Sequence, residues 1–406
     1  GAVPARLEPG AAVGAVMIDG DLRLAATGTV TDVDGERVLA FGHPFLGLGP
    51  IRVPMATAEI VTVVSNQYSS FKLSNLGTAV GAFEQDRAAG IQGRLGATAP
   101  MIPLTVRVGS GPEARTFRMR LADVPQYTPL LLATSALGGL EAATYIGGAQ
   151  GLDLSARFRL SGGRELELRQ SFAGDGAAIQ GATFLLAVAS YLVQNPLERI
   201  ALEGVDVELG QQAEPRSAQL VGAHAERTVV RPGERLTLNV DLVPYRGAPF
   251  RRSFQLDLPE DLPAGRYSLL VGDGTSVDAA RFAIEPVEPV TFAQAFELLG
   301  SLHSRRDIVA LGVYGGQGLA IAGEVLPRLP ASVRSLWAGT PTGGAVPLKL
   351  AVAQRHREPV DLPVEGLVRV DLEVRRREPL APAPPAPADA AEPDAASPQE
   401  AGEKGR

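Results

Sequence analysis

The sequence predicts a mainly β, multi-domain protein of 406 residues. Two observations lead to this fold class. The composition includes 46 Gly and 32 Pro, which favour turns and end helices. Short apolar stretches also alternate with turn signals along most of the chain, as they do in sandwiches and barrels. With 45% apolar and 20% charged residues the chain can bury real cores, and its length predicts two to four domains at roughly 100–200 residues each.

The composition excludes several classes of function. The chain has no Cys, so disulfides, thiol catalysis and cysteine metal sites are ruled out. Lys and Arg total 38 against 45 for Asp and Glu, and this net charge of -7 argues against nucleic acid as the main partner. No apolar run reaches the ~18–20 residues of a membrane span. Because the chain begins with Gly1, we expect a processed product or a fragment.

Residues 1–124 are predicted to form a β-barrel portion. The stretch 21–41 reads strand, Asp34-Gly35 turn, strand, which is a strong hairpin signal. Short strands separated by Gly and Pro favour a barrel or a sandwich. Further strands are predicted at 58–64, 78–83, 90–95, 102–108 and 114–122.

Residues 125–210 are predicted to form an α+β segment. Two stretches rich in Leu and Ala, 129–143 and 177–193, have helical composition, and Pro196 marks the end of the second. Strands with alternating polarity are predicted at 152–160, 165–172 and 200–209.

The rest of the chain is predicted to hold two more units and a tail. Residues 211–289 have the turn spacing of an immunoglobulin-like or fibronectin-like sandwich, with strands at 236–242 and 266–271. Residues 290–378 predict a small α/β unit, whose first helix Thr291 can cap. The Pro- and Ala-rich residues 379–406 predict a disordered tail.

The most informative chemistry lies at His43. An apolar strand delivers this His to a turn between Gly42 and Pro44. In a two-barrel serine peptidase the general base stands at such a strand end, where its imidazole can take the proton of a serine hydroxyl. The alternative is a structural His that is hydrogen-bonded to nearby backbone.

The residues around His43 resemble a known family. Gly28-Thr29-Val30-Thr31 and Ala40-Phe41-Gly42-His43-Pro44-Phe45 resemble the catalytic-His segment of SpoIVB-type serine peptidases, in particular secreted bacterial proteins that contain this domain. The resemblance covers about residues 10–108. It implies a chymotrypsin-like barrel, a periplasmic or secreted location, protein or peptide substrates, and His43 as the catalytic histidine. Matching segments also include Ser70-Phe71-Lys72, Gln85-Asp86-Arg87, Gly90-Ile91-Gln92-Gly93 and Met101-Ile102-Pro103.

One element of the family is missing. Its nucleophile lies in a Gly-x-Ser-Gly-Ser-Pro segment, and this chain has none; Ser110, between Gly109 and Gly111, is in a turn-like sequence. In the long secreted subgroup the serine segment precedes the His segment. We therefore expect the nucleophile outside this chain, and whether the chain is itself an enzyme stays open.

Asp86 is the acid that we select as a second catalytic candidate. It could orient an imidazole, or it could pair with Arg87 or cap a turn. A Ser–Lys dyad of Ser69 or Ser70 with Lys72 would need a desolvated amine, for which the sequence gives no sign.

The remaining histidines, His224, His303 and His356, are predicted to be structural, and no metal-ligand spacing or cofactor motif is present. Two functions therefore compete: the His-bearing portion of a SpoIVB-like serine endopeptidase of the cell envelope, and a non-catalytic envelope scaffold or binding protein with a peptidase-like fold. A sugar-binding role has little support, because Trp337 is the only Trp. The sequence does not specify the oligomeric state.

Overall fold

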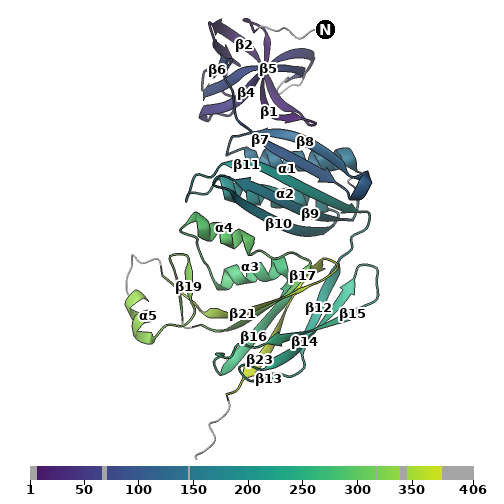
Figure 1. Cartoon of the computed structure of the whole chain (residues 1–406), viewed down its shortest axis with the longest axis vertical. Coiled ribbons are helices and arrows are strands. Elements are labelled where there is room, and N and C mark those ends of the chain that lie inside the picture. The colour runs from purple at the N-terminus through teal and green to yellow at the C-terminus, as the bar shows by residue number, and fades with distance from the viewer. Residues whose placement is uncertain (1–6, 66–70, 145–146, 317, 339–344, 377–406) are drawn as a thin grey trace, which may run out of the picture.

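A computed structural model describes residues 7–65, 71–144, 147–316, 318–338 and 345–376. Three parts follow one another along the long axis: a barrel at the N-terminal end, a layer of strands and two helices, and a pair of sheets at the other end (Figure 1). The prediction of a mainly β, multi-domain protein is confirmed. The predictions for Gly1, Ser69, Ser70 and the tail 379–406 lie outside the described residues.

The first part is a closed barrel of antiparallel strands in the order β1-β2-β3-β6-β5-β4, with β4 pairing back onto β1. The Asp34-Gly35 turn joins β2 and β3 as predicted, with Gly35 at a φ of 58°. Strand β1 was not predicted, because Ala and Gly carry little β signal. The strands are β1 (Ala12–Gly20), β2 (Leu24–Asp34), β3 (Arg37–Ala40), β4 (Gly49–Val64), β5 (Phe71–Arg87) and β6 (Gly90–Leu95).

The middle part is a sheet with two helices packed against it, which we call the α/β layer. Its strand order is β10-β9-β11-β7-β8, and β8 pairs with the end of β1. The predicted boundary at 124/125 falls inside this layer, between β8 and α1. The elements are β7 (Met101–Val108), β8 (Arg115–Ala122), α1 (Thr128–Ala143), β9 (Gln150–Leu160), β10 (Arg164–Gly174), α2 (Ala177–Val193) and β11 (Leu202–Gln212), with a short 3₁₀ turn at Gly111–Glu113.

The third part consists of two sheets that share one core. The first contains β12 (Ala218–Ala225), β14 (Arg235–Pro244), β15 (Phe250–Asp257) and β22 (Val364–Glu365). The second contains β13 (Val229–Val230), β16 (Gly265–Asp273), β17 (Asp307–Gly315), β21 (Leu350–Pro359) and β23 (Leu367–Val374). Strands from 290–378 therefore pair with strands from 211–289. The two predicted units share sheets, because strand pairing across the chain leaves no local sequence signal.

Helices connect and flank these sheets. Helix α3 (Gly274–Ile284), which the sequence analysis did not predict, follows β16 directly, and Asp273 caps it by accepting a hydrogen bond from the Ser276 backbone N–H at 3.0 Å. Helix α4 (Phe292–Gly300) begins at the predicted cap, Thr291, which forms a complete capping box. A small sheet of β18 (Leu319–Ile321), β19 (Glu324–Leu326) and β20 (Val346–Pro347) lies near α5 (Ala331–Ala338).

The α/β layer is joined to the third part by a polar cluster. The guanidinium of Arg306 donates to both carboxylate oxygens of Asp153, at 2.8–3.2 Å, and to the Ser171 hydroxyl at 3.0 Å. Gln170 accepts from the Arg305 backbone N–H at 2.9 Å. Among the described residues no helix has the length and apolarity to cross a membrane.

Candidate functional site

The loop that carries His43 begins with an unusual backbone conformation. Strand β3 ends at Ala40, and both Phe41 and Gly42 then have positive φ values, 74° and 73°. Glycine adopts this conformation without cost, whereas a bulky residue such as Phe41 rarely does. The chain turns sharply here and leaves the barrel before β4 begins at Gly49.

Contacts of Phe41 hold the strained turn. Its backbone N–H donates to the Thr29 carbonyl at 2.9 Å, and its ring lies on Gly28, where an added Cβ would be 2.1 Å from Cδ1. The ring also meets those of Phe45 and Phe83 edge to face, with centroids 5.8 and 6.0 Å apart. Gly28 and Phe41 lie in two separate segments of the sequence motif around His43, and the structure places them in direct contact.

Asp86 anchors the same loop from inside. Asp86 is buried, with only 1% of its surface exposed to solvent. The carboxylate accepts backbone N–H groups from Phe45 at 2.8 Å, Leu46 at 2.5 Å and Gly47 at 2.6 Å. Three donors satisfy a buried carboxylate that would otherwise be costly to desolvate. Of the roles considered for Asp86, this corresponds to the turn cap.

His43 lies exposed at the start of this anchored loop. Its Nδ1 is 2.8 Å from the carbonyl oxygen of Pro44. A carbonyl only accepts, so Nδ1 carries the hydrogen, and in the neutral imidazole Nε2 keeps its lone pair. The ring rests against Phe41, with centroids 5.9 Å apart.

The structure brings His43 and Asp86 to one loop but does not join their side chains. Among the described residues, neither a carboxylate nor a serine hydroxyl hydrogen-bonds to the His43 imidazole. Lys72 donates from Nζ to the Thr29 hydroxyl at 2.6 Å on the exposed surface. An exposed ammonium in this position lacks the desolvation that a Ser–Lys dyad requires.

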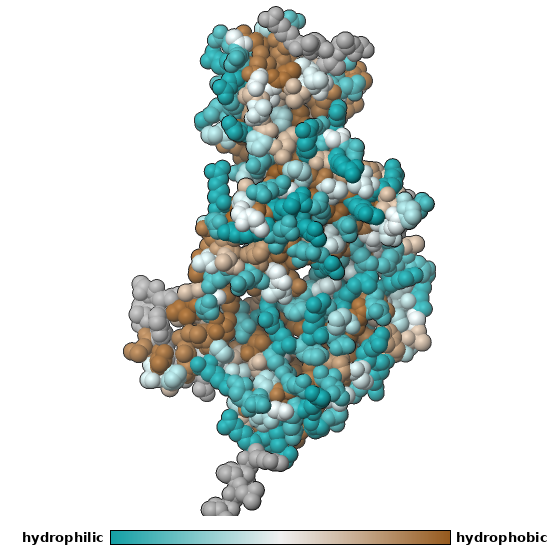
Figure 2. Space-filling model, viewed as in Figure 1, coloured by the Kyte–Doolittle hydropathy of each residue, from teal (hydrophilic) through white to brown (hydrophobic). Residues whose placement is uncertain are grey.

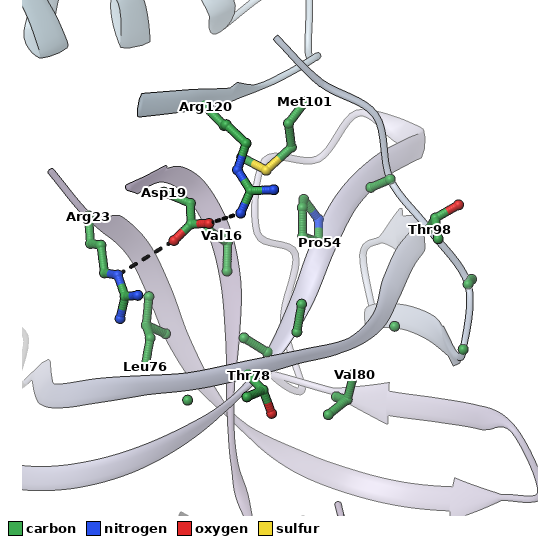
Figure 3. A pocket seen from close by; sticks show the side chains of 17 residues that line it. Val16, Asp19, Arg23, Pro54, Leu76, Thr78, Val80, Thr98, Met101 and Arg120 are labelled. Carbon is green, nitrogen blue, oxygen red and sulfur yellow. Dashed lines mark hydrogen bonds and ion pairs between the residues drawn. The ribbon is translucent and has the colours of Figure 1, made fainter. Parts of the chain in front are cut away.

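A cavity of about 650 Å³ lies elsewhere, between the barrel and the α/β layer (Figure 3). The charged residues that line it are Asp19, Arg23 and Arg120. Asp19 forms ion pairs with Arg23 at 3.5 Å and with Arg120. The cavity and the His43 loop are at opposite ends of β1, since the loop binds Thr29, the partner of Ala12. No motif in the sequence predicted this cavity; the small residues at 77–79 and 96–99 that line it could have indicated it.

The other histidines each contact a group within the fold. The Nδ1 of His303 lies 2.8 Å from the buried carboxylate of Asp278, which also accepts the His303 backbone N–H at 2.6 Å. His356 stacks on Phe254 with ring centroids 5.3 Å apart. His224 forms an exposed ion pair with Asp241 at 3.2 Å.

In the part of the chain that the structure describes, no group of three His, Asp or Glu side chains could hold a metal ion. Comparisons with known proteins found no match: no family model, no curated protein and no solved structure matches the chain.

Proposed function

We propose that this chain carries the general base, His43, of a serine peptidase, and that the nucleophilic serine comes from residues other than those described. The observation that carries the proposal is the Nδ1 hydrogen bond to Pro44. It fixes the tautomer that leaves the Nε2 lone pair on an exposed ring, which is what a base needs in order to take the proton of a serine hydroxyl.

The rigidity of the loop supports this role. A base works when its position is fixed before substrate binds. The three bonds to Asp86 and the packing of Phe41 on Gly28 fix the backbone on both sides of His43. The closed antiparallel barrel that bears this loop is consistent with the chymotrypsin-like fold that the resemblance implies, and the two-sheet third part with an immunoglobulin-like sandwich.

In this proposal Pro44 replaces the usual carboxylate partner. A carbonyl orients the imidazole, but it stabilises the imidazolium less than a carboxylate does. The buried carboxylate of Asp86 has its hydrogen bonds directed to the loop backbone instead. The substrates would be polypeptides, and the location would be the periplasm or the cell exterior, as the resemblance implies.

One observation favours the second candidate, a non-catalytic envelope scaffold. Within the described residues no hydroxyl lies in hydrogen-bond contact with His43. A scaffold would keep the anchored loop as a binding surface and would need no nucleophile.

Labelling with a fluorophosphonate probe and hydrolysis of a fluorescent casein, both on the full-length natural polypeptide, separate the two candidates. For a peptidase, His43→Ala should lower both rates about 10²- to 10⁴-fold with an unchanged circular dichroism spectrum. His224→Ala, which removes another exposed imidazole, is the matched control and should retain both rates. Undiminished turnover in His43→Ala would overturn the proposal, and a wild-type protein without labelling or hydrolysis would favour the scaffold.

A further inference from the structure

Among the described residues, helices α1 and α2 pack on one face of the α/β layer and no helix covers the opposite face. Along β7, Leu104 and Val106 are buried toward α1, and the alternate residues Thr105 and Arg107 point to the opposite, open face. This face is hollowed by a concavity of about 490 Å³. Hydrophilic residues dominate the α/β layer in Figure 2. We call this concave surface the open face.

Most of the charges on the open face are paired. Arg159 forms an ion pair with Asp206, and Glu167 pairs with Arg169 at 2.8 Å and with Arg157 at 3.5 Å. These pairs involve three of the arginines on β9 and β10, of which Arg157 and Arg169 share the single carboxylate of Glu167.

Arg107 and Arg118 are different. Within the described residues neither guanidinium has an ion pair or a hydrogen bond, and both side chains are exposed. The β7–β8 register pairs Thr105 with Arg118 and Arg107 with Thr116, so the two arginines are diagonal neighbours. Like charges on adjacent strands repel each other, and an anion bound between them would relieve that repulsion.

We propose that the open face binds an acidic polypeptide segment through Arg107 and Arg118. Guanidinium groups bind carboxylates in a bidentate geometry. The hydroxyls of Thr105, Thr116 and Ser155 line the same concavity and can hydrogen-bond to a peptide backbone. The site requires neither His43 nor a serine nucleophile, so it stands independently of the peptidase proposal.

The acidic residues of the open face select a polypeptide over a nucleic acid. Glu208 lies beside Arg107 in the β11–β7 register, and Asp206 and Glu167 line the same concavity. A nucleic acid carries one negative charge per nucleotide, so these carboxylates would repel some of its phosphates. A peptide can instead place its carboxylates at the arginines and uncharged residues beside the acids.

Fluorescence anisotropy on the full chain tests the proposal. The probes are a fluorescein-labelled peptide rich in Glu, Gly and Ser and a labelled single-stranded oligonucleotide of the same length. Arg107→Ala with Arg118→Ala should weaken peptide binding at least about tenfold, the effect of losing one charge-assisted contact. The double Lys variant, which keeps the charge but loses the bidentate geometry, should bind with intermediate affinity.

Arg216→Ala is the matched control, because Arg216 is exposed, has no ion pair in the described part of the chain and lies outside the open face. Its peptide affinity should equal that of the wild type, and thermal melts should show that all variants are folded. Three results would each overturn the proposal: a wild-type chain that does not bind the peptide, an oligonucleotide that binds as tightly as the peptide, or a loss in Arg216→Ala as large as in the double Ala variant.

Discussion

The carboxylate of Asp86 binds the backbone that follows His43, and not the His43 imidazole. The acid and the base are therefore coupled through the loop rather than through a hydrogen bond between their side chains. Asp86 determines where residues 45–47 lie. His43, which carries the imidazole, precedes these residues by two positions in the same loop. A substitution at Asp86 should act first on the stability of the loop and only through it on His43.

Replacement of Asp86 by Asn tests this coupling. Asn keeps the shape of the side chain, but it exchanges one acceptor oxygen for an amide NH₂ group that would face backbone N–H donors. Asp86→Asn should lower the free energy of unfolding by about 2–3 kcal/mol, measured by urea denaturation, and should expose the loop to limited proteolysis.

Asp34→Asn is the matched control. Asp34 forms an ion pair with Arg37 at the tip of the β2–β3 hairpin, and its side chain is 75% exposed. Loss of this pair should change the unfolding free energy only slightly, since exposed pairs contribute about 0–1 kcal/mol. Equal stability of the Asp86 and Asp34 variants would show that Asp86 does not anchor the loop.

Local patterns in the sequence predicted the elements that local physics determines. The Asp34-Gly35 turn, the two helices of the α/β layer and the Thr291 cap all depend on residues within a few positions of one another. Pairings between distant strands were not predictable in this way. The contact of β16 with β17 and β23, for example, joins segments separated by a helix pair and by the small sheet.

The site shows the same division. The sequence identified His43 and Asp86 as candidates, and Asp86, on strand β5, does bind the loop that carries His43. It did not separate the roles considered for Asp86, because the direction of a carboxylate depends on how the loop folds back over β5. The positive φ of Phe41 and its contact with Gly28 likewise have no sequence signal, since a Phe before a Gly is compatible with an ordinary strand end.

That contact gives a second prediction. An Ala at position 28 would place its Cβ 2.1 Å from the Phe41 ring, and the ring cannot move freely because Phe45 and Phe83 pack against it. Gly28→Ala should therefore lower the unfolding free energy by about 1–3 kcal/mol and shift the NMR resonances of the His43 ring.

Gly300→Ala serves as its control, because, beyond its own helix and its chain neighbours, no described residue has an atom within 4 Å of the added Cβ, and Gly300 ends helix α4. That variant should be as stable as the wild type or slightly more so. A Gly28→Ala protein with wild-type stability and unshifted His43 resonances would mean that the Phe41 ring does not fix the turn.

The third prediction concerns pH and the carboxyl group of Glu285, which follows helix α3. Burial raises the pKa of Glu285 above its ordinary value of 4.5, although the Val352 backbone N–H and the charges of Arg281 and Arg355 lower it in part. The folded state thus disfavours the charged carboxylate. Well below pH 4.5 the carboxyl is protonated in both states and carries no penalty. As pH rises, the unfolded chain loses its proton first, so stability falls until the folded group also ionises.

Glu285→Gln removes this titration and keeps an oxygen that can accept the Val352 N–H, now at 3.2 Å. Urea denaturation should therefore show the variant to be more stable than the wild type at neutral pH, with the difference disappearing at acid pH. Glu288→Gln, at an exposed position on the same segment, should differ from the wild type by the same small amount at both pH values. A difference in unfolding free energy between the wild type and Glu285→Gln that stayed constant from acid to neutral pH would contradict this prediction. It would mean that Arg281, Arg355 and Val352 fully offset the cost of burying the carboxylate, so that the pKa of Glu285 is not raised.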